Sequence, residues 1–286
     1  MKRFLATVAS LAGLGACAST VHDAPGGGST ISVGDGGSAA AVATIPAVVR
    51  DFRFYDLFDL TTDPDFENPP YGIDGNGAPS TGYTGPWDDH GIVSGTLGAD
   101  GKPVYESAGG TLTTHGQAAF DAWYHDAPGR NYPVTYLLPL TRQDGQGGAL
   151  QYDSEAQGVP YGPSVPDQGN GFFPIDDGSP DETPFGNQGK AHNYSFTVEI
   201  HTVFTYKGGE QFSFRGDDDV FVFIDSKLVI DLGGIHGPET AQVDVGSLGL
   251  TIGQTYPLDF FSAERHVTGS NIRFQTTLDL RPVQSQ

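Results

Sequence analysis

The stretch FRGDDDVFVFID, from Phe214 to Asp225, places three carboxylates directly before a run of bulky apolar residues. Its continuation, DVFVFIDSKLVIDL, contains the triplet Asp225-Ser226-Lys227, a candidate tight turn between two strands. Both arms are too apolar to be exposed on either face, so the stretch predicts a buried β-hairpin. Three adjacent like charges at its entrance repel one another, and they need either full solvation or a cation.

The residues around this hairpin extend the β pattern. Turn signals separate further strand candidates, which read YSFTVEIHTVFTY, EQFSFRG, AQVDV, TYPLDFFSAE and NIRFQTTLDL. Upstream, AVVRDFRFYDLFDL has a strand-like period of two, and most of the chain from there to Thr183 carries loop signals. HGQAAFDAWYHD is a helix candidate with Phe120, Trp123 and Tyr124 on one face. The pattern predicts an all-β, antiparallel fold with long loops and at most one or two short helices.

The N-terminus predicts export. Residues 1–16 have a basic start and an apolar stretch too short to span a bilayer, as in a bacterial signal peptide. The sequence Leu14-Gly15-Ala16-Cys17 resembles a lipoprotein lipobox, which implies lipidation of Cys17 and a place on the outer membrane or cell surface. A plain secretory signal with an incidental cysteine is the alternative. Residues 17–45 are rich in Gly, Ser and Ala and predict a tether, which leaves residues 46–286 as one domain.

The charge balance excludes one class of partner. Without Lys2 and Arg3, the 14 basic residues fall to 12, against 35 acidic residues. Nucleic acids and anionic membrane surfaces attract clustered Lys and Arg, so neither is expected to bind here. Cations and neutral ligands fit this composition better, and the lipid anchor would be the only membrane contact.

Two blocks of sequence carry a resemblance. FTVEIHTVFTYKGGEQFSFRGDDDVFVFIDSKLVIDLGGIHGP, followed by LGLTIGQTYPLDFFSAERHVTGSNIRF, resembles the fibro-slime domain of cell-surface and secreted proteins. The fibro-slime domain is in turn similar to the protective-antigen-type β-sandwich, which includes calcium-dependent sugar-binding adhesin modules. The resemblance implies a β-sandwich fold and a role in binding.

The resemblance also implies a calcium site. In the similar lectins, two adjacent aspartates joined by a cis peptide bind calcium, and the matching tract here is Asp217-Asp218-Asp219, with the pair left open. Asn271 matches by position an asparagine that completes the site. Calcium suits such hard oxygen ligands. The alternative is an acidic turn that keeps an edge strand soluble.

Three further residues are candidates for ligand binding. His236 lies between glycines after the hairpin, where it either lines a groove or serves as a turn residue. Trp87, beside Asp88 and Asp89, is a candidate platform for the C–H face of a sugar. Glu264 ends a predicted strand. Glu264 with Asp259, or Glu199 with Glu210, could also be named as the pair of carboxylates that a glycosidase needs.

These patterns predict a non-catalytic surface binding or adhesion protein that recognises polysaccharide or matrix glycan with calcium as cofactor. The alternatives are a structural matrix protein whose calcium only stabilises loops, and a glycan hydrolase. No nucleophile elbow or phosphate loop supports an enzyme. The acidic loops TTDPDFEN and FFPIDDGSPDETP lack the EF-hand register and predict solvated loops.

Overall fold

The computed structural model describes residues 30–31, 43–56, 62–66, 87–107, 109–142, 148–155, 171–176, 183–266 and 269–283. Its strands up to β7 are β1 (Thr30–Ile31), β2 (Ala43–Phe52), β3 (Trp87–Asp88), β4 (Asn131–Arg142), β5 (Leu150–Asp153), β6 (Phe196–Thr205) and β7 (Gln211–Gly216). The later strands are β8 (Asp219–Ile224), β9 (Lys227–Leu232), β10 (Gly234–Ile235), β11 (Glu239–Asp244), β12 (Thr255–Glu264), β13 (Ile272–Thr276) and β14 (Arg281–Pro282).

The predicted hairpin forms as β8 and β9. They pair antiparallel, and Asp225 and Ser226 between them both have positive φ, at 54° and 60°. These angles match a two-residue type I′ turn, whose twist suits the flanking strands. All six residues of β8 are buried, as the unbroken apolar sequence predicts. The same prediction is wrong for β9, where only Ile230 and Leu232 are buried.

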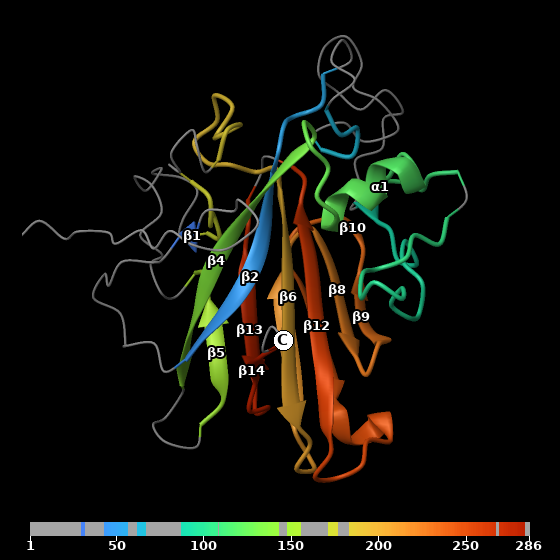
Figure 1. The fold of residues 1–286 in the computed structure, drawn as a ribbon, viewed down its shortest axis with the longest axis vertical. Coiled ribbons are helices and arrows are strands. Elements are labelled where there is room, and N and C mark those ends of the chain that lie inside the picture. Colours follow the sequence, from blue (N-terminus) through green and yellow to red (C-terminus); the bar gives the residue numbers. More distant parts are fainter. Residues whose placement is uncertain are drawn as a thin grey trace, which may run out of the picture.

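Two antiparallel sheets pack face to face (Figure 1). The first runs β4-β2-β6-β12-β8-β9 and the second runs β5-β13-β7-β11. Strand β4 belongs to the first sheet but pairs with β5 at its C-terminal end, through Thr141 and Arg142, so it joins the two. This arrangement confirms the predicted all-β sandwich.

The first sheet is covered on both faces, which explains its composition. Val220, Val222 and Ile224 of β8 face the second sheet and share the main core with it. Phe221 and Phe223 point the other way, into a second apolar cluster outside the first sheet. A sheet buried on both sides needs apolar residues at successive positions rather than alternate ones.

Helix α1 (Gln117–Tyr124) supplies much of that second cluster. Phe120, Trp123 and Tyr124 are fully buried and pack in a chain of aromatic contacts that reaches Phe261 of β12. Figure 1 shows α1 beside the ends of β12 and β8. The predicted helix and its apolar face are therefore confirmed.

No helix among the described residues is long and apolar enough to cross a membrane.

The first half of the domain holds more sheet than the sequence predicted. Strand β4, with twelve residues, and β5 lie in a region that was expected to be mostly loop. Pro133 and Pro139 lie within β4, and proline normally argues against a central strand. Beside the full-length pairing with β2, the described part of β4 makes only two short pairings, with β1 and β5. Strand β2 begins at Ala43, three residues before the expected domain start.

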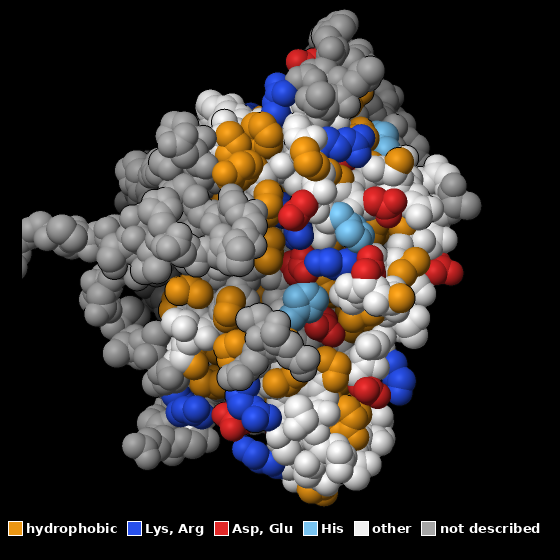
Figure 2. All heavy atoms as spheres, in the orientation of Figure 1, with side chains coloured by type: hydrophobic (Ala, Val, Ile, Leu, Met, Phe, Trp, Pro, Cys, Tyr) orange, Lys and Arg blue, Asp and Glu red, His pale blue; other side chains and the backbone are white. Residues whose placement is uncertain are grey.

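A charged network covers part of the first sheet's outer face. Glu199 on β6 contacts Lys102 and Arg50, and its Oε1 accepts a hydrogen bond from His201 Nε2 at 2.6 Å. The other ring nitrogen of His201 lies 2.7 Å from Asp259 Oδ1 on β12. Burial opposes both charges, yet these partners lower the pKa of Glu199 to about 2 and raise that of His201 to about 9. Figure 2 shows charged and histidine side chains gathered on this face.

The hairpin turn gives a first prediction. Ser226 is an exposed non-glycine residue with φ 60°, where glycine avoids the Cβ penalty. We expect Ser226→Gly to raise the free energy of unfolding by about 0.5 kcal/mol, because the turn is strongly favourable to glycine at this position. Thermal unfolding measures the change, and Ser213→Gly within β7 is the control, expected to destabilise. A lower melting temperature for Ser226→Gly would contradict the turn assignment.

Candidate functional site

The acidic tract lies where the chain passes from one sheet to the other. Strand β7 of the second sheet ends at Gly216, and β8 of the first sheet begins at Asp219. Asp217 and Asp218 are the connection between them. All three aspartates are buried. Among the described residues no peptide bond is cis, so the cis geometry of the similar lectins is not present in this tract.

Backbone and side-chain N–H groups from three other segments meet the tract. Asp217 accepts hydrogen bonds from the backbone N–H of Asn271 and, at 2.9 Å, from its side-chain amide. Asp218 accepts from the backbone N–H of His236 at 3.1 Å and of Arg265 at 3.0 Å. Each carboxylate oxygen of these two residues therefore already has a protein donor.

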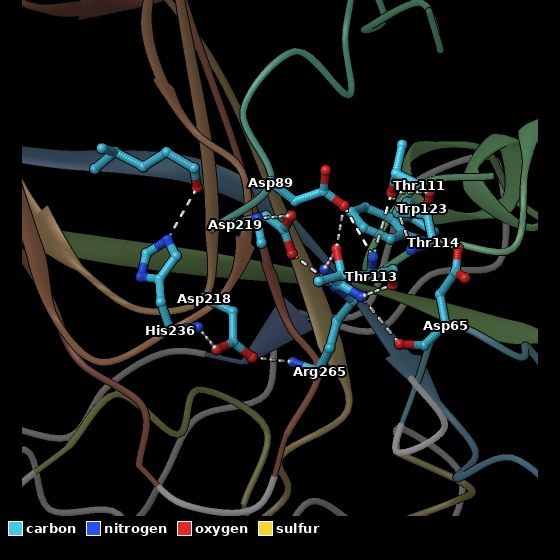
Figure 3. A network of polar contacts seen from close by, with 12 residues as sticks. Asp65, Asp89, Thr111, Thr113, Thr114, Trp123, Asp218, Asp219, His236 and Arg265 are labelled. Carbon is cyan, nitrogen blue, oxygen red and sulfur yellow. Dashed lines mark hydrogen bonds and ion pairs between the residues drawn. The ribbon is translucent and has the colours of Figure 1, made fainter. Parts of the chain in front are cut away.

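The side chain of Arg265 brings a buried positive charge to the acidic tract. The Nε of Arg265 donates to Asp219 Oδ2 at 2.6 Å, and Gly234 N–H donates to Oδ1 at 2.7 Å. The Arg265 guanidinium also donates to the carbonyl oxygens of Thr113 and Asp65, at 2.7 and 3.3 Å (Figure 3). The sequence raised the question of which cation holds these charges together, and for Asp219 that cation is Arg265.

The surroundings of Arg265 tie the site to α1. Its guanidinium carbon lies 4.6 Å from the ring centroid of Trp123, a cation–π contact that burial strengthens. Trp123 Nε1 donates to Asp65 Oδ2 at 3.2 Å, and Asp65 Oδ1 lies 2.8 Å from His115 Nδ1. Burial opposes the charge of Arg265, but Asp219 raises its pKa. Arg265 therefore stays charged in the interior.

Four buried carboxyl groups gather at this end of the domain, and burial opposes the ionisation of all of them. Burial raises the pKa of Asp217 and of Asp219, and it raises that of Asp218 to about 8 against the opposing effect of Arg265. Glu264, at the end of β12, has its pKa raised well above the ordinary value by burial, then by Asp218 and Asp217. Its Oε2 is buried with no hydrogen-bond partner among the described residues. Of these four groups only Asp219 is paired with the guanidinium, and the raised pKa values of Asp218 and Glu264 favour their protonated forms.

The structure brings most of the predicted site residues to one place. His236, Glu264 and Asn271 come from three segments and adjoin the tract, as described above. The backbone of Trp87 lies near that of His236, because Trp87 pairs with the preceding residue, Ile235, through strands β3 and β10. Cys17 lies outside the described residues. Sequence reasoning missed Arg265, and its only sequence signal is an arginine directly after a buried strand end.

Calcium takes about six to eight oxygen ligands, and the three aspartates of the tract differ in how well they fit it. Asp219 fits poorly because its Oδ2 is paired with the charged guanidinium of Arg265, whereas the oxygens of Asp217 and Asp218 accept only from neutral N–H groups. Asp217 and Asp218 fit better, since they lie near the unpartnered oxygen of Glu264. In the described part of the chain, no three acidic, histidine or cysteine side chains form a metal-binding group. The calcium site stays a prediction, centred on Asp217, Asp218 and Asn271.

One expectation about the acidic loops is wrong. Asp63 and Asp65 of TTDPDFEN are buried rather than solvated, because they accept hydrogen bonds from Asp65 N–H, His115 and Trp123. Asp176 of the second loop is also buried and accepts from Asn193 N–H at 2.6 Å. The other acids named in these loops lie outside the described residues.

The residues considered for glycoside hydrolysis do not form a pair. Glu264 and Asp259 are five positions apart on β12, so their side chains point to opposite faces of the sheet. Glu199 is held in the charged network, whereas Glu210 accepts from the backbone N–H groups of Lys207 and Gly208. None of these carboxylates lines any of the three cavities described below.

Comparisons with known proteins agree with the coarse part of the resemblance. Residues 178–284 match the family model of the PA14 domain. The chain is 42% identical over 198 residues to protein psiD and 38% identical over 198 residues to protein psiQ, both of Dictyostelium discoideum. Each match covers 66% of this chain, but only 36% of psiD and 18% of psiQ.

Solved structures give weaker likenesses. The PA14 sugar-binding domain from an RTX adhesin aligns with 83% of this chain and 90% of its own, at 12% identity and a TM-score of 0.30. The PA14 domain of the antifreeze protein MpAFP aligns with 30% of this chain and 44% of its own, at 16% identity and a TM-score of 0.23. The fibro-slime assignment itself stays a prediction.

Proposed function

We propose that this chain is a non-catalytic, carbohydrate-binding surface protein that recognises polysaccharide or matrix glycan at the end of the sandwich formed by Asp217, Asp218, His236, Glu264 and Asn271. The PA14 match over residues 178–284 supports the ligand class, because a PA14 domain of an RTX adhesin is described as sugar-binding. The observation that carries the proposal is the convergence of these residues on one end of the fold, where the buried Oε2 of Glu264 has no hydrogen-bond partner among the described residues.

Calcium is part of this proposal. It would be held by Asp217 and Asp218, with Asn271 and nearby backbone carbonyls. It would replace the protons that burial favours on these carboxyl groups, and it would bind sugar hydroxyls. The protein's own residues orient the two carboxylates. The Asn271 side chain holds Asp217 by a hydrogen bond, and the backbone N–H groups of His236 and Arg265 hold Asp218. Lipidation at Cys17 and attachment to an outer membrane or cell surface complete the proposal.

The test is a glycan array probed with the full chain, with calcium and then with chelator. We expect binding to at least one neutral polysaccharide class, and its loss in the double variant Asp217→Asn with Asp218→Asn. The melting temperature of the wild type should also rise with calcium, since a ligand that binds only the folded state stabilises it. The matched control is Asp279→Asn, which alters an exposed carboxylate elsewhere.

Each alternative gives a different result. Calcium-dependent stabilisation without glycan binding would favour a structural matrix protein. Release of reducing sugar from a bound polysaccharide would show a hydrolase. Glycan binding that survives in the double variant would remove the acidic tract from the proposal, and an unchanged melting temperature would remove calcium.

A further inference from the structure

An open hollow of about 490 Å³ lies on the far side of α1 from Arg265. It is lined by three segments, through Asp100, Ala118, Asp121, Ala122, His125, Ala127 and Arg130. Its volume falls in the range of small-ligand sites, roughly 300–1,000 Å³. The other two hollows described, of about 20 and 10 Å³, are narrow gaps lined mainly by apolar core side chains.

The two faces of α1 explain why a hollow forms here. Phe120, Trp123 and Tyr124 fill the core on one face. Residues 118, 121, 122 and 125 follow the spacing of the opposite face, and two of them are alanines. Small side chains on a helix face leave room that larger ones would fill. Ala118 and Ala122 therefore line the hollow with small apolar side chains, and polar residues surround them.

Those polar groups are held in fixed positions. Asp100 Oδ1 accepts from Lys102 N–H at 3.1 Å, and its Oδ2 lies 2.9 Å from His125 Nε2. The other ring nitrogen of His125 lies 2.7 Å from the carbonyl oxygen of Asp121, and Arg130 donates to the carbonyl oxygen of Ala118 at 2.9 Å. A ligand would meet groups that are already ordered, which reduces the entropy lost on binding.

Part of each of these side chains is exposed and can contact a ligand. The side chains of Asp100, His125 and Arg130 are 57%, 45% and 30% exposed. Both nitrogens of His125 are engaged, so its exposed part is mostly ring carbon. The carboxylate of Asp121 has no hydrogen-bond partner within the described residues, and it is exposed. The hollow thus offers a free acceptor, a donor and a small flat surface.

The chemistry of the lining selects the ligand. Two carboxylates disfavour phosphate, sulfate and carboxylate ligands, and Arg130 disfavours a simple cation. A sugar unit satisfies all the groups, because its hydroxyls donate to Asp121 and accept from Arg130 while its C–H face covers the imidazole and the alanines. The lining is also linked to the charged network of the first sheet's outer face, because Asp100 accepts from the backbone N–H of Lys102, whose side chain contacts Glu199.

We propose that this hollow is a second carbohydrate-binding site, which takes one neutral pyranose unit through a pair of its hydroxyl groups on Asp121. The inference rests on the proposed function for its ligand class, but not on the acidic tract or on calcium. Two sites on one domain would let a single polysaccharide chain, or two neighbouring chains, bind with higher avidity than either site gives alone.

The experiment is saturation-transfer NMR with the full chain and four neutral disaccharides as probes: cellobiose, maltose, lactose and mannobiose. It is run in chelator, so that a calcium site does not contribute. We expect at least one probe to bind, and Asp121→Ala to weaken it about tenfold, as loss of a charged hydrogen-bond acceptor does. Ala118→Trp should abolish binding by filling the hollow. Gln117→Trp places the same ring on an adjacent exposed position outside the lining, and it should bind normally.

The outcomes separate this inference from the proposed function. Binding that persists in Asp217→Asn with Asp218→Asn but is lost in Ala118→Trp supports the second site. Binding that is lost in the aspartate double variant and unchanged in Ala118→Trp and Asp121→Ala overturns the second site and leaves the proposed function in place. If no probe binds the wild type in chelator while the glycan array is positive with calcium, the second site is also overturned.

Discussion

Arg265→Met is expected to lower the free energy of unfolding by about 3–5 kcal/mol, the usual cost of removing one partner of a buried ion pair. Arg265 and Asp219 are both fully buried, and methionine leaves the Asp219 carboxylate with only the Gly234 N–H. The carbonyl oxygens of Thr113 and Asp65 lose donors as well. Urea unfolding followed by tryptophan fluorescence measures the change, because Trp123 lies against the guanidinium.

Two further variants check the cause. Arg273 forms an ion pair with Asp153 at 3.4 Å and is 45% exposed, so Arg273→Met should cost at most about 1 kcal/mol. Asp219→Asn added to Arg265→Met should recover part of the loss, because no buried charge is then left unpaired. If Arg265→Met costs no more than Arg273→Met, Arg265 is not the cation that holds the tract.

The second large effect concerns pH. Asp51 on β2 is fully buried, and burial raises its pKa from 3.8 to about 7, against hydrogen bonds from Asn193 and Phe185 that lower it. A raised pKa means that the folded protein holds a proton that the unfolded chain has released. This contribution to stability is complete below the unfolded value and is lost as pH rises to about 7, in total on the order of 4 kcal/mol.

The measurement compares wild type with Asp51→Asn. Asparagine resembles the protonated acid and does not titrate, so the difference in unfolding free energy between the two proteins should move in favour of the variant as pH rises from about 4 to about 8. Urea unfolding at several pH values gives this difference directly. Asp279→Asn, an exposed control, should show almost no pH-dependent difference. A constant difference across the range would mean that Asp51 is ionised throughout.

The local parts of the fold could be predicted from the sequence. The β8–β9 hairpin follows from a continuous apolar run and a two-residue turn, and α1 follows from the spacing of Phe120, Trp123 and Tyr124. Strand β4 could not be recognised because its two prolines argue against a strand. Its position depends on pairing with β2, about ninety residues earlier, which no local pattern reports.

Only part of the candidate site could be predicted from the sequence. A buried strand entrance with three aspartates marks the place. Asn271, 54 residues from Asp217, is assigned to it only through the resemblance to the calcium-binding lectins, and the sequence leaves His236 open between a groove and a turn. Arg265 contacts Thr113 and Asp65, which lie 152 and 200 residues away, so its role depends on the tertiary structure alone. Burial of Asp65 was missed for the same reason, since its partners Trp123 and His115 arrive from α1 and the segment before it.

The position of the acidic tract has a mechanical consequence for a protein held at a surface. The chain crosses between the two sheets from β7 to β8 and again from β12 to β13, and these crossings are bonded to each other through Asp217 with Asn271 and Asp218 with Arg265. A pulling force that separates the sheets loads these bonds together rather than one after another. The hydrogen bonds between the two crossings therefore share the load, and the domain should resist tension best at the end of the sandwich where it is proposed to bind its ligand.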